Sequence, residues 1–341
     1  MDYRNLGESG LKVSPICLGT MMFGDRTDAA EAGRIVASAR EAGVNFIDTA
    51  DVYAKGESER ITGDLIRGNR EGWVLATKVA NPTSDDPNHR GTSRVHILRA
   101  LDESLKRLGT DYIDVYYLHK DDTSTPLSES LRALADCVRQ GKIRYYALSN
   151  FRAWRIAEAV SLCDAQGIAR PVCLQPYYNA MNRMPEVEVL PACTYFGLGV
   201  VPYSPLARGV LTGKYVPDAK PPEGSRVARA DKRMLQTEFR RESMQCAQKM
   251  AEHAKSRGIT AGQFAVSWVL ANDIVSSVLA GPRTLEQWSE YVGALQYAWN
   301  AEDEALVDSL VPQGHPSTPG YSDPMYPFFG RTRAGNPIRG A

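Results

Sequence analysis

Short apolar runs alternate with amphipathic segments along most of this chain. Eight runs of four to seven residues lack the strict alternation of a half-exposed sheet, so they predict buried strands. These runs span residues 16–20, 44–48, 73–77, 113–118, 143–149, 172–175, 199–204 and 276–280. Between two of them, leucines at three- and four-residue spacing predict a helix over 93–108, which Ser93 can cap and Gly109 can end.

Eight successive strand–helix units predict an α/β fold in which the strands close into a (β/α)8 TIM barrel. The whole chain, residues 1–341, is then one barrel domain. The alternative is a doubly wound open sheet. We rank it second because a GxGxxG fingerprint does not follow the first strand and a GxxxxGK[ST] phosphate loop does not occur.

Three segments depart from a plain barrel. Residues 3–13 predict an N-terminal β-hairpin that plugs the end where the strands begin. A long segment follows the seventh strand, with a Pro/Gly-rich loop at 205–230 and helices at about 241–257 and 260–271. The irregular C-terminal tail, 312–341, is rich in proline and aromatic residues, and we expect it to fold over the barrel mouth as a lid on the substrate pocket.

Composition narrows the class of partner. Forty Lys and Arg residues balance forty Asp and Glu residues, so nothing in the charge favours nucleic acid or a membrane surface, and a small-molecule substrate is expected. Six scattered cysteines without CxxC or Cys/His spacing predict no metal site and reduced thiols in a cytoplasmic protein. The start of the chain lacks a signal-peptide pattern. The sequence leaves open whether the protein forms a homo-oligomer.

Polar residues at the ends of apolar strands are the candidates for chemistry, because the active sites of TIM barrels lie at that end. Asp48 ends the second strand, Tyr53 lies in the loop behind it, Lys78 follows the third strand, and His119 follows the fourth. Asp48 and Lys78 can form an ion pair. We expect Lys78 to favour the phenolate and so lower the pKa of Tyr53 from about 10. Tyr53 then donates a proton to a carbonyl oxygen that His119 orients.

Each of these four residues also has an ordinary structural interpretation. Asp48 could cap a helix, Lys78 could reach solvent, His119 could be a satisfied core histidine, and Tyr53 could pack against its neighbours. Their arrival on adjacent strands favours chemistry, since a core does not need this combination. No Ser/His/Asp triad or nucleophilic cysteine can be identified, so hydride from a bound cofactor is the best candidate for the attacking group.

Several motifs in one order resemble the aldo-keto reductase family, in particular a bacterial branch related to the potassium-channel β-subunit-like members. They are GTMMFG (19–24), FIDTADVYAKGESE (46–59), ATK (76–78), YYLH (116–119), ALSNF (147–151), LQPYYN (174–179), PYSPLARGVLTGKY (202–215) and AGPRTLEQWSE (280–290). The resemblance implies reversible NADPH-dependent reduction of an aldehyde or ketone, with NADH less favoured than NADPH. It also implies a catalytic tetrad of Asp48, Tyr53, Lys78 and His119.

The same resemblance implies a set of cofactor contacts. Ser149, Asn150 and Gln175 would hold the nicotinamide carboxamide, Tyr203 would stack on its ring, and Arg283 would meet the 2′-phosphate. The full set is Gly19, Thr20, Met21, Asp48, Ser149, Asn150, Gln175, Tyr203, Ser204, Leu206, Gly209, Lys214, Gly281, Arg283, Gln287 and Tyr291. Tyr291 stands where the family usually has an asparagine that contacts the adenine.

The substrate is less defined by sequence than the reaction. Met22, Phe23, Tyr53, His119 and the segment 81–91 are expected to line the carbonyl pocket, with Tyr321, Tyr326, Phe328 and Phe329 of the tail as further walls. Such walls suit a bulky or xenobiotic carbonyl, although the tail aromatics could instead simply cover core surface. Two alternatives stay open. One is a non-catalytic or weakly catalytic NADP(H)-sensing regulatory subunit, like the potassium-channel β-subunits, and the other is an enzyme that acts mainly as an alcohol dehydrogenase.

Overall fold

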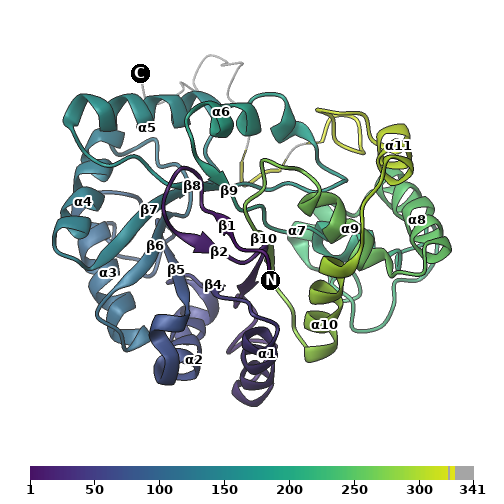
Figure 1. Ribbon diagram of the computed structural model, residues 1–341, viewed down its shortest axis with the longest axis horizontal. Helices are drawn as coiled ribbons and strands as arrows, with labels where there is room; N and C mark the ends of the chain where they lie inside the picture. The colour runs from purple at the N-terminus through teal and green to yellow at the C-terminus, as the bar shows by residue number, and fades with distance from the viewer. Residues whose placement is uncertain (322, 327–341) are drawn as a thin grey trace.

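A curled sheet of parallel strands forms the centre of the molecule. The computed structural model describes residues 1–321 and 323–326, and across these residues eight strands join in one sheet with helices around it (Figure 1). In spatial order the strands are β10 (Val278–Ala280), β3 (Ile16–Gly19), β4 (Phe46–Asp48), β5 (Val74–Val79), β6 (Ile113–Leu118), β7 (Ile143–Ser149), β8 (Cys173–Gln175) and β9 (Gly199–Val200). Every neighbouring pair is parallel.

The two outer strands of this order also meet each other. Val200 pairs with Val275 and Tyr203 pairs with Leu279 as parallel bridges. The backbone N–H of Leu279 donates to the carbonyl of Pro202 at 2.9 Å, and that of Ser276 donates to the carbonyl of Val200 at 2.9 Å. These contacts bring β10 beside β9, so the predicted (β/α)8 TIM barrel is confirmed.

Helices cover the outside of the barrel. They are α1 (Ala29–Glu41), α2 (Glu57–Ile66), α3 (Arg94–Leu108), α4 (Leu127–Arg139), α5 (Ala153–Gln166), α6 (Val189–Tyr195), α9 (Ala261–Leu270) and α10 (Leu285–Gly293). Helix α3 follows its sequence signals closely. The Ser93 side chain accepts from the backbone N–H of His96, and Gly109 ends the helix with φ of 63°.

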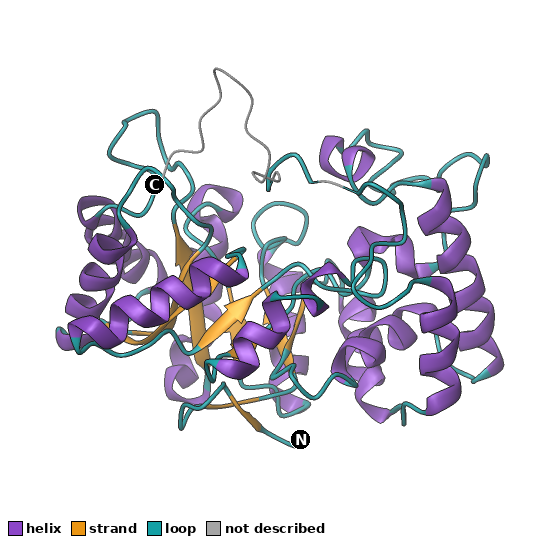
Figure 2. Cartoon of the chain, turned by 90° about the horizontal axis from the view of Figure 1, so that it is seen from above, coloured by secondary structure: helices purple, strands orange, loops and turns teal. Residues whose placement is uncertain are grey.

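The barrel interior is a packed core that the N-terminal hairpin closes at one end. Strands β1 (Arg4–Asn5) and β2 (Lys12–Val13) pair antiparallel, as predicted. Leu6 and Val13, both fully buried, join the interior cluster with Phe46 and Tyr117. Figure 2 shows the N-terminal segment at one end of the barrel. Since the hairpin fills the end where the strands begin, the other end is available for a site.

The interval between β9 and β10 carries extra structure. It contains the 3-10 helix η4 (Ala207–Thr212), the short helix α7 (Lys232–Gln236), and α8 (Arg241–Ser256) before α9. The two longer helices agree with the sequence prediction. Helix α7 was not predicted, because five residues give too short a pattern. Asp231 caps it by accepting from the backbone N–H of Met234 at 3.0 Å.

The last described helix, α11 (Ala301–Leu310), leads into the tail. Ser317 donates its backbone N–H to the carbonyl of Met181 at 2.8 Å, and its hydroxyl lies 2.8 Å from that of Ser243. The predicted pocket walls Phe328 and Phe329 lie outside the described residues. Over the described part of the chain, no helix is both long and apolar enough to span a membrane.

Candidate active site

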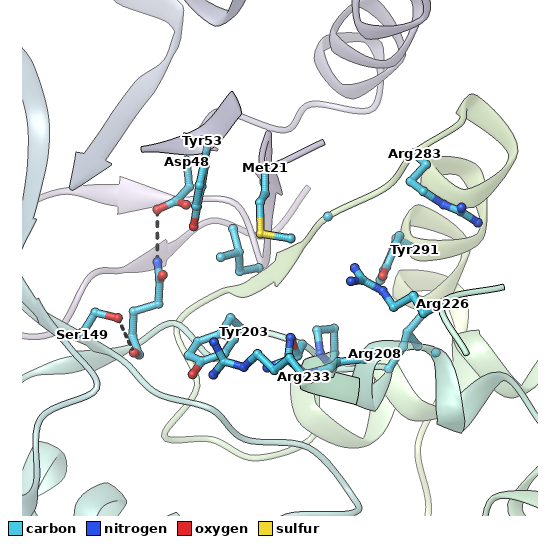
Figure 3. A pocket seen from close by; sticks show the side chains of 18 of the residues that line it. Met21, Asp48, Tyr53, Ser149, Tyr203, Arg208, Arg226, Arg233, Arg283 and Tyr291 are labelled. Atoms are coloured by element: carbon cyan, nitrogen blue, oxygen red, sulfur yellow. Dashed lines mark hydrogen bonds between the residues drawn. The ribbon is translucent and has the colours of Figure 1, made fainter. Parts of the chain in front are cut away.

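A cavity of about 390 Å³ opens where the strands of the barrel finish. Most of the residues predicted for the site line it: Gly19, Met21, Asp48, Tyr53, His119, Ser149, Asn150, Gln175, Tyr203, Ser204, Leu206, Gly209, Lys214, Gly281, Arg283, Gln287 and Tyr291. Figure 3 shows Asp48 and Tyr53 at one end, Arg283, Arg226 and Tyr291 at the other, and Met21 between them. The barrel topology therefore brings together side chains that are far apart in the sequence.

Lys78 is buried beneath this cavity. Its ammonium donates to the Asp48 carboxylate, to the Thr49 carbonyl at 2.7 Å and to the Tyr53 hydroxyl at 3.5 Å. Burial opposes the charge on Lys78, but Asp48 and then Tyr53 raise its pKa above the usual range, so the amine is protonated. Lys78 was predicted to follow its strand. The predicted end of this strand was wrong by two residues, because β5 runs to Val79. Lys78 therefore lies within the strand, and its side chain is buried in the barrel interior.

Tyr53 opens the 3-10 helix η1 (Tyr53–Gly56), which puts its hydroxyl over the Asp48–Lys78 pair. Its ring meets the His119 ring edge-on, with centroids 5.9 Å apart. Burial raises the pKa of Tyr53 by more than Lys78 lowers it, and Asp48 adds to the rise. The sequence-based expectation of a lowered pKa is therefore wrong for the protein alone: it counted the nearby cation but not the desolvation of the phenolate.

His119 follows β6 and is fixed at its backbone. Its N–H donates to the Val79 carbonyl at 2.8 Å, and its carbonyl accepts from the Asn150 side chain at 2.9 Å. Burial holds the pKa of His119 well below its usual range, and Lys78 and Lys120 lower it further. The imidazole is therefore neutral at physiological pH and can donate one N–H hydrogen bond.

Residues after β7, β8 and β9 form a second connected group. The Tyr203 hydroxyl donates to the Asn150 side-chain oxygen at 2.8 Å, and the Ser149 hydroxyl donates to the Gln175 carbonyl at 3.0 Å. The Gln175 amide donates to Asp48 at 3.1 Å (Figure 3). This network fixes polar groups and one aromatic ring beside the Asp48–Lys78 pair, where the sequence predicted nicotinamide contacts. The role itself stays a prediction.

The far end of the cavity is cationic. Burial lowers the pKa of Arg283, and the neighbouring Arg229 and Arg226 lower it further. Lys214 has a lowered pKa from partial burial and from Arg283 and Arg226, with Glu290 acting in the opposite direction. Cations that lower one another's pKa in this way are stabilised by an anion.

Several lining residues were missed by sequence reasoning. They are Val52, Pro205, Arg208, Thr212, Arg226, Arg233, Leu279, Glu290 and Met325. Tyr326, which was predicted as a pocket wall, and Asn81, which belongs to the predicted wall segment 81–91, both line the cavity. Arg208 lies in the motif PYSPLARGVLTGKY. Its ion pair with Glu238 at 2.9 Å could not be predicted, because Glu238 lies 30 residues further along the chain, just after α7.

Like Lys78, the predicted site residues Thr20, Met22 and Phe23 do not line the cavity. Thr20 is buried, and its hydroxyl donates to the Asp48 carbonyl at 3.2 Å. Met22 and Phe23 are buried in a turn in which Thr27 donates its backbone N–H to the Met22 carbonyl at 3.0 Å. The turn folds both apolar side chains under the mouth, so the prediction that they form substrate walls is wrong.

Asp51 is buried although it lies in the loop between β4 and η1. Its side chain is 3% exposed, and neither carboxylate oxygen has a hydrogen-bond partner among the described residues. Burial, reinforced by Glu59, raises the pKa of Asp51 to about 8. Asp51 is therefore a buried and largely protonated acid at neutral pH rather than a solvated loop residue.

The mouth of the cavity is bordered by α7 and by the tail. Arg233 pairs with Asp323 at 2.8 Å and lies over the Tyr326 ring at 5.6 Å from the centroid. Arg152 donates to the Tyr326 carbonyl at 3.1 Å. Met325 and Tyr326 thus line the cavity as part of the tail, whereas Tyr321 is not among the lining residues.

An ion pair, a phenol and an imidazole lie at one end of the cavity and cations lie at the other. The cavity opens at the end of the parallel barrel where the active sites of TIM-barrel enzymes are found. The family model described as the aldo/keto reductase family matches residues 15–312. The chain belongs to this family and is an NADP-dependent oxidoreductase.

Curated relatives extend over nearly the whole chain. The chain is 39% identical over 334 residues to an uncharacterized oxidoreductase, YrpG, of Bacillus subtilis (strain 168), covering 94% of this chain and 98% of the relative. It is 38% identical over 304 residues to a probable voltage-gated potassium channel subunit beta of Arabidopsis thaliana, covering 86% and 91%. A rice protein with the same description is 37% identical over 300 residues, again covering 86% and 91%.

Proposed function

We propose that this protein reduces an aldehyde or ketone to the alcohol, reversibly, with NADPH as the cofactor and Tyr53 as the proton donor. The observation that carries the proposal is one continuous cavity with Tyr53 and neutral His119 at one end, charged Lys78 buried beneath them, and a cationic group at the other end. Aldo/keto reductases generally carry out NADPH-dependent carbonyl reduction, which supports the same reaction class.

The cationic end fits the phosphates of NADPH. Lys214, Arg226 and Arg283 crowd one another without an equal number of acids, so a phosphate would relieve their repulsion. Ser149, Asn150, Gln175 and Tyr203 would hold the nicotinamide end. When bound, NADPH supplies the hydride that the carbonyl carbon accepts.

The side chains handle the proton. Tyr53 donates its hydroxyl proton to the carbonyl oxygen, and the developing phenolate lies 3.5 Å from the Lys78 ammonium. This attraction grows as negative charge forms on Tyr53, so it stabilises the transition state more than the ground state. His119 donates a hydrogen bond to the same carbonyl oxygen and orients it toward Tyr53.

We propose a bulky carbonyl compound as the substrate. Val52, Met325 and Tyr326 provide apolar and aromatic surface at the mouth, with Arg233 beside them. The tail segment that contains Met325 and Tyr326 would act as a lid on the substrate. Cytoplasmic action is supported by the six cysteines, which are all free thiols.

A regulatory subunit is the second candidate. The two plant relatives described as potassium channel β-subunits favour it. The intact contacts among Asp48, Lys78 and Tyr53 favour catalysis, since a sensor of bound nucleotide does not need a proton donor.

Cofactor fluorescence separates these candidates. The protein is titrated with NADPH and, separately, with NADH, and NADPH oxidation is then followed with a panel of small and bulky aldehydes and ketones. We expect tighter binding of NADPH and turnover of bulky carbonyls. Binding without turnover of any carbonyl would favour the regulatory subunit, and binding of neither cofactor would refute both candidates.

A further inference from the structure

Asn81, two residues after the end of β5, is held in a constrained position. Ala80, the residue before Asn81, has φ of 139°, a conformation that non-glycine residues rarely adopt. Pro82 follows Asn81. The backbone N–H of Gly91 donates to the Ala80 carbonyl at 2.8 Å and so closes the loop. Proline restricts Asn81 to extended backbone. Because the backbone is constrained on both sides, the direction in which the side chain leaves the Asn81 backbone is set.

That side chain meets the imidazole of His119. The Asn81 amide nitrogen lies 3.0 Å from His119 Nδ1. Among residues 1–321 and 323–326 this is the one hydrogen bond of the His119 ring, so Nε2 is left without a partner there, and both residues line the cavity. The ring therefore has one nitrogen bound by the protein and one nitrogen available to a substrate.

Which nitrogen carries the proton decides what His119 can do. A neutral imidazole has a single N–H, and the tautomer is set by the hydrogen bond that the other nitrogen makes. If Nδ1 accepts from the amide of Asn81, the proton is on Nε2, which can then donate to a carbonyl oxygen. If Nδ1 carried the proton, the Nε2 lone pair would face the carbonyl oxygen and repel it.

We propose that Asn81 is a positioning residue that fixes His119 in the Nε2–H tautomer by donating its amide N–H to Nδ1. The inference rests on the proposed function, because it explains how His119 donates to the substrate. The groups that face the His119 ring support a neutral state: burial, Lys78, Lys120 and Arg233 all lower its pKa, and Tyr53 packs against it as an uncharged phenol. No acid among the groups that shift this pKa holds a second proton on the ring.

Replacement of Asn81 by aspartate should reverse the tautomer of His119. In Asn81→Asp the carboxylate accepts from Nδ1–H, so the neutral ring leaves Nε2 without a proton. The new negative charge also raises the pKa of His119. We expect kcat/KM for carbonyl reduction to fall about 100-fold at neutral pH, and to recover as the pH is lowered and both nitrogens become protonated.

Matched variants isolate this effect. Asn88→Asp places the same charge on the same loop. Asn88 was predicted to be part of the pocket wall, but it is exposed, does not line the cavity and donates its backbone N–H to Asp86. We expect this variant to retain wild-type activity and an unchanged pH profile. Asn81→Ala should lose activity at every pH without recovery in acid, since it removes the donor and adds no charge. If the role of Asn81 were merely structural, Asn81→Asp would not regain kcat/KM as the pH is lowered.

The tautomer can be read directly on the cofactor-free protein. Long-range ¹H–¹⁵N correlation spectra of ¹⁵N-labelled protein distinguish the two neutral forms, and His119→Asn identifies the signals of His119. We expect Nε2–H in the wild type, Nδ1–H in Asn81→Asp and a mixture in Asn81→Ala. An Nδ1–H wild type, or the wild-type pattern in Asn81→Asp, would overturn the inference. Because this readout needs no turnover, it separates failure of the inference from failure of the proposed carbonyl reduction.

Discussion

The Lys78 ammonium lies 3.5 Å from the Tyr53 phenolic oxygen, and Tyr53 nevertheless has a raised pKa. Burial removes water from the phenolate and outweighs the nearby positive charge. The resting site therefore holds a protonated phenol above a charged amine. The favourable charge–charge interaction forms only as the proton leaves Tyr53, so this pair contributes mainly to the transition state of carbonyl reduction.

This relationship predicts the pH dependence of the two reaction directions. A raised pKa keeps Tyr53 protonated as the pH rises through neutrality and past the usual phenol value of about 10. We expect kcat/KM for carbonyl reduction to stay flat from pH 7 to about 9 and to fall only in strong alkali. Alcohol oxidation needs the phenolate, so its rate should rise over the same range. Steady-state profiles in both directions test this, and an alkaline fall of reduction centred near pH 8 would contradict it.

The cationic end of the cavity predicts the cofactor preference. Arg283→Gln removes a charge that Arg226 and Arg229 already crowd. We expect the affinity for NADPH to fall about 10- to 100-fold, with little change for NADH, because the lost partner is the 2′-phosphate. Fluorescence titration with both cofactors measures the difference. Arg60→Gln, at an exposed arginine of α2, is the matched control and should leave both affinities unchanged. Equal losses for NADPH and NADH would refute a 2′-phosphate contact.

Asp51 predicts how stability depends on pH. Its pKa is raised to about 8 in the folded protein from a value near 4 in the unfolded chain. Between about pH 4 and pH 8, the folded protein therefore holds a proton that the unfolded chain releases. Stability is therefore highest at the acidic end of the window and falls as the pH rises through it, by at most about 1.4 kcal/mol per pH unit. Asp51→Asn should remove this fall.

Chemical denaturation at pH 5 and pH 8 compares the free energies of unfolding. We expect the wild type to lose stability relative to Asp51→Asn at the higher pH. Asp85→Asn, in the exposed loop 81–91, should behave like the wild type. Parallel pH dependence in the wild type and Asp51→Asn would show that Asp51 is ionised, or solvated, in the folded protein.

The barrel and the meeting of Asp48, Lys78 and His119 at one end of it could be predicted from sequence, because both follow from strand periodicity. Each strand ends at the same side of a parallel barrel, so Asp48, Lys78 and His119 had to meet once their strands were assigned. Even the two-residue error at Lys78 did not change this outcome. The long helices could also be predicted from local sequence. Helix α3, for example, begins after the capping residue Ser93 and ends at Gly109.

Contacts that depend on irregular backbone could not be predicted. Arg226 is aimed by its pairing with Asp231 at 3.1 Å, and Arg233 by its pairing with Asp323 in the tail. Met22 and Phe23 are buried by a turn that periodicity does not describe. Asn81 reaches His119 from a loop that begins with the unusual φ of Ala80, and nothing in the residue types indicates that conformation.

The central claim is that Tyr53 donates the proton in NADPH-dependent carbonyl reduction, and Tyr53→Phe tests it most directly. The measurement compares kcat/KM for the best carbonyl of the panel in wild type and variant, with the Kd for NADPH determined for both. We expect a loss of 10²- to 10⁴-fold in kcat/KM with an unchanged Kd, because the ring is kept and only the proton is removed. Full reductase activity in Tyr53→Phe would contradict the account.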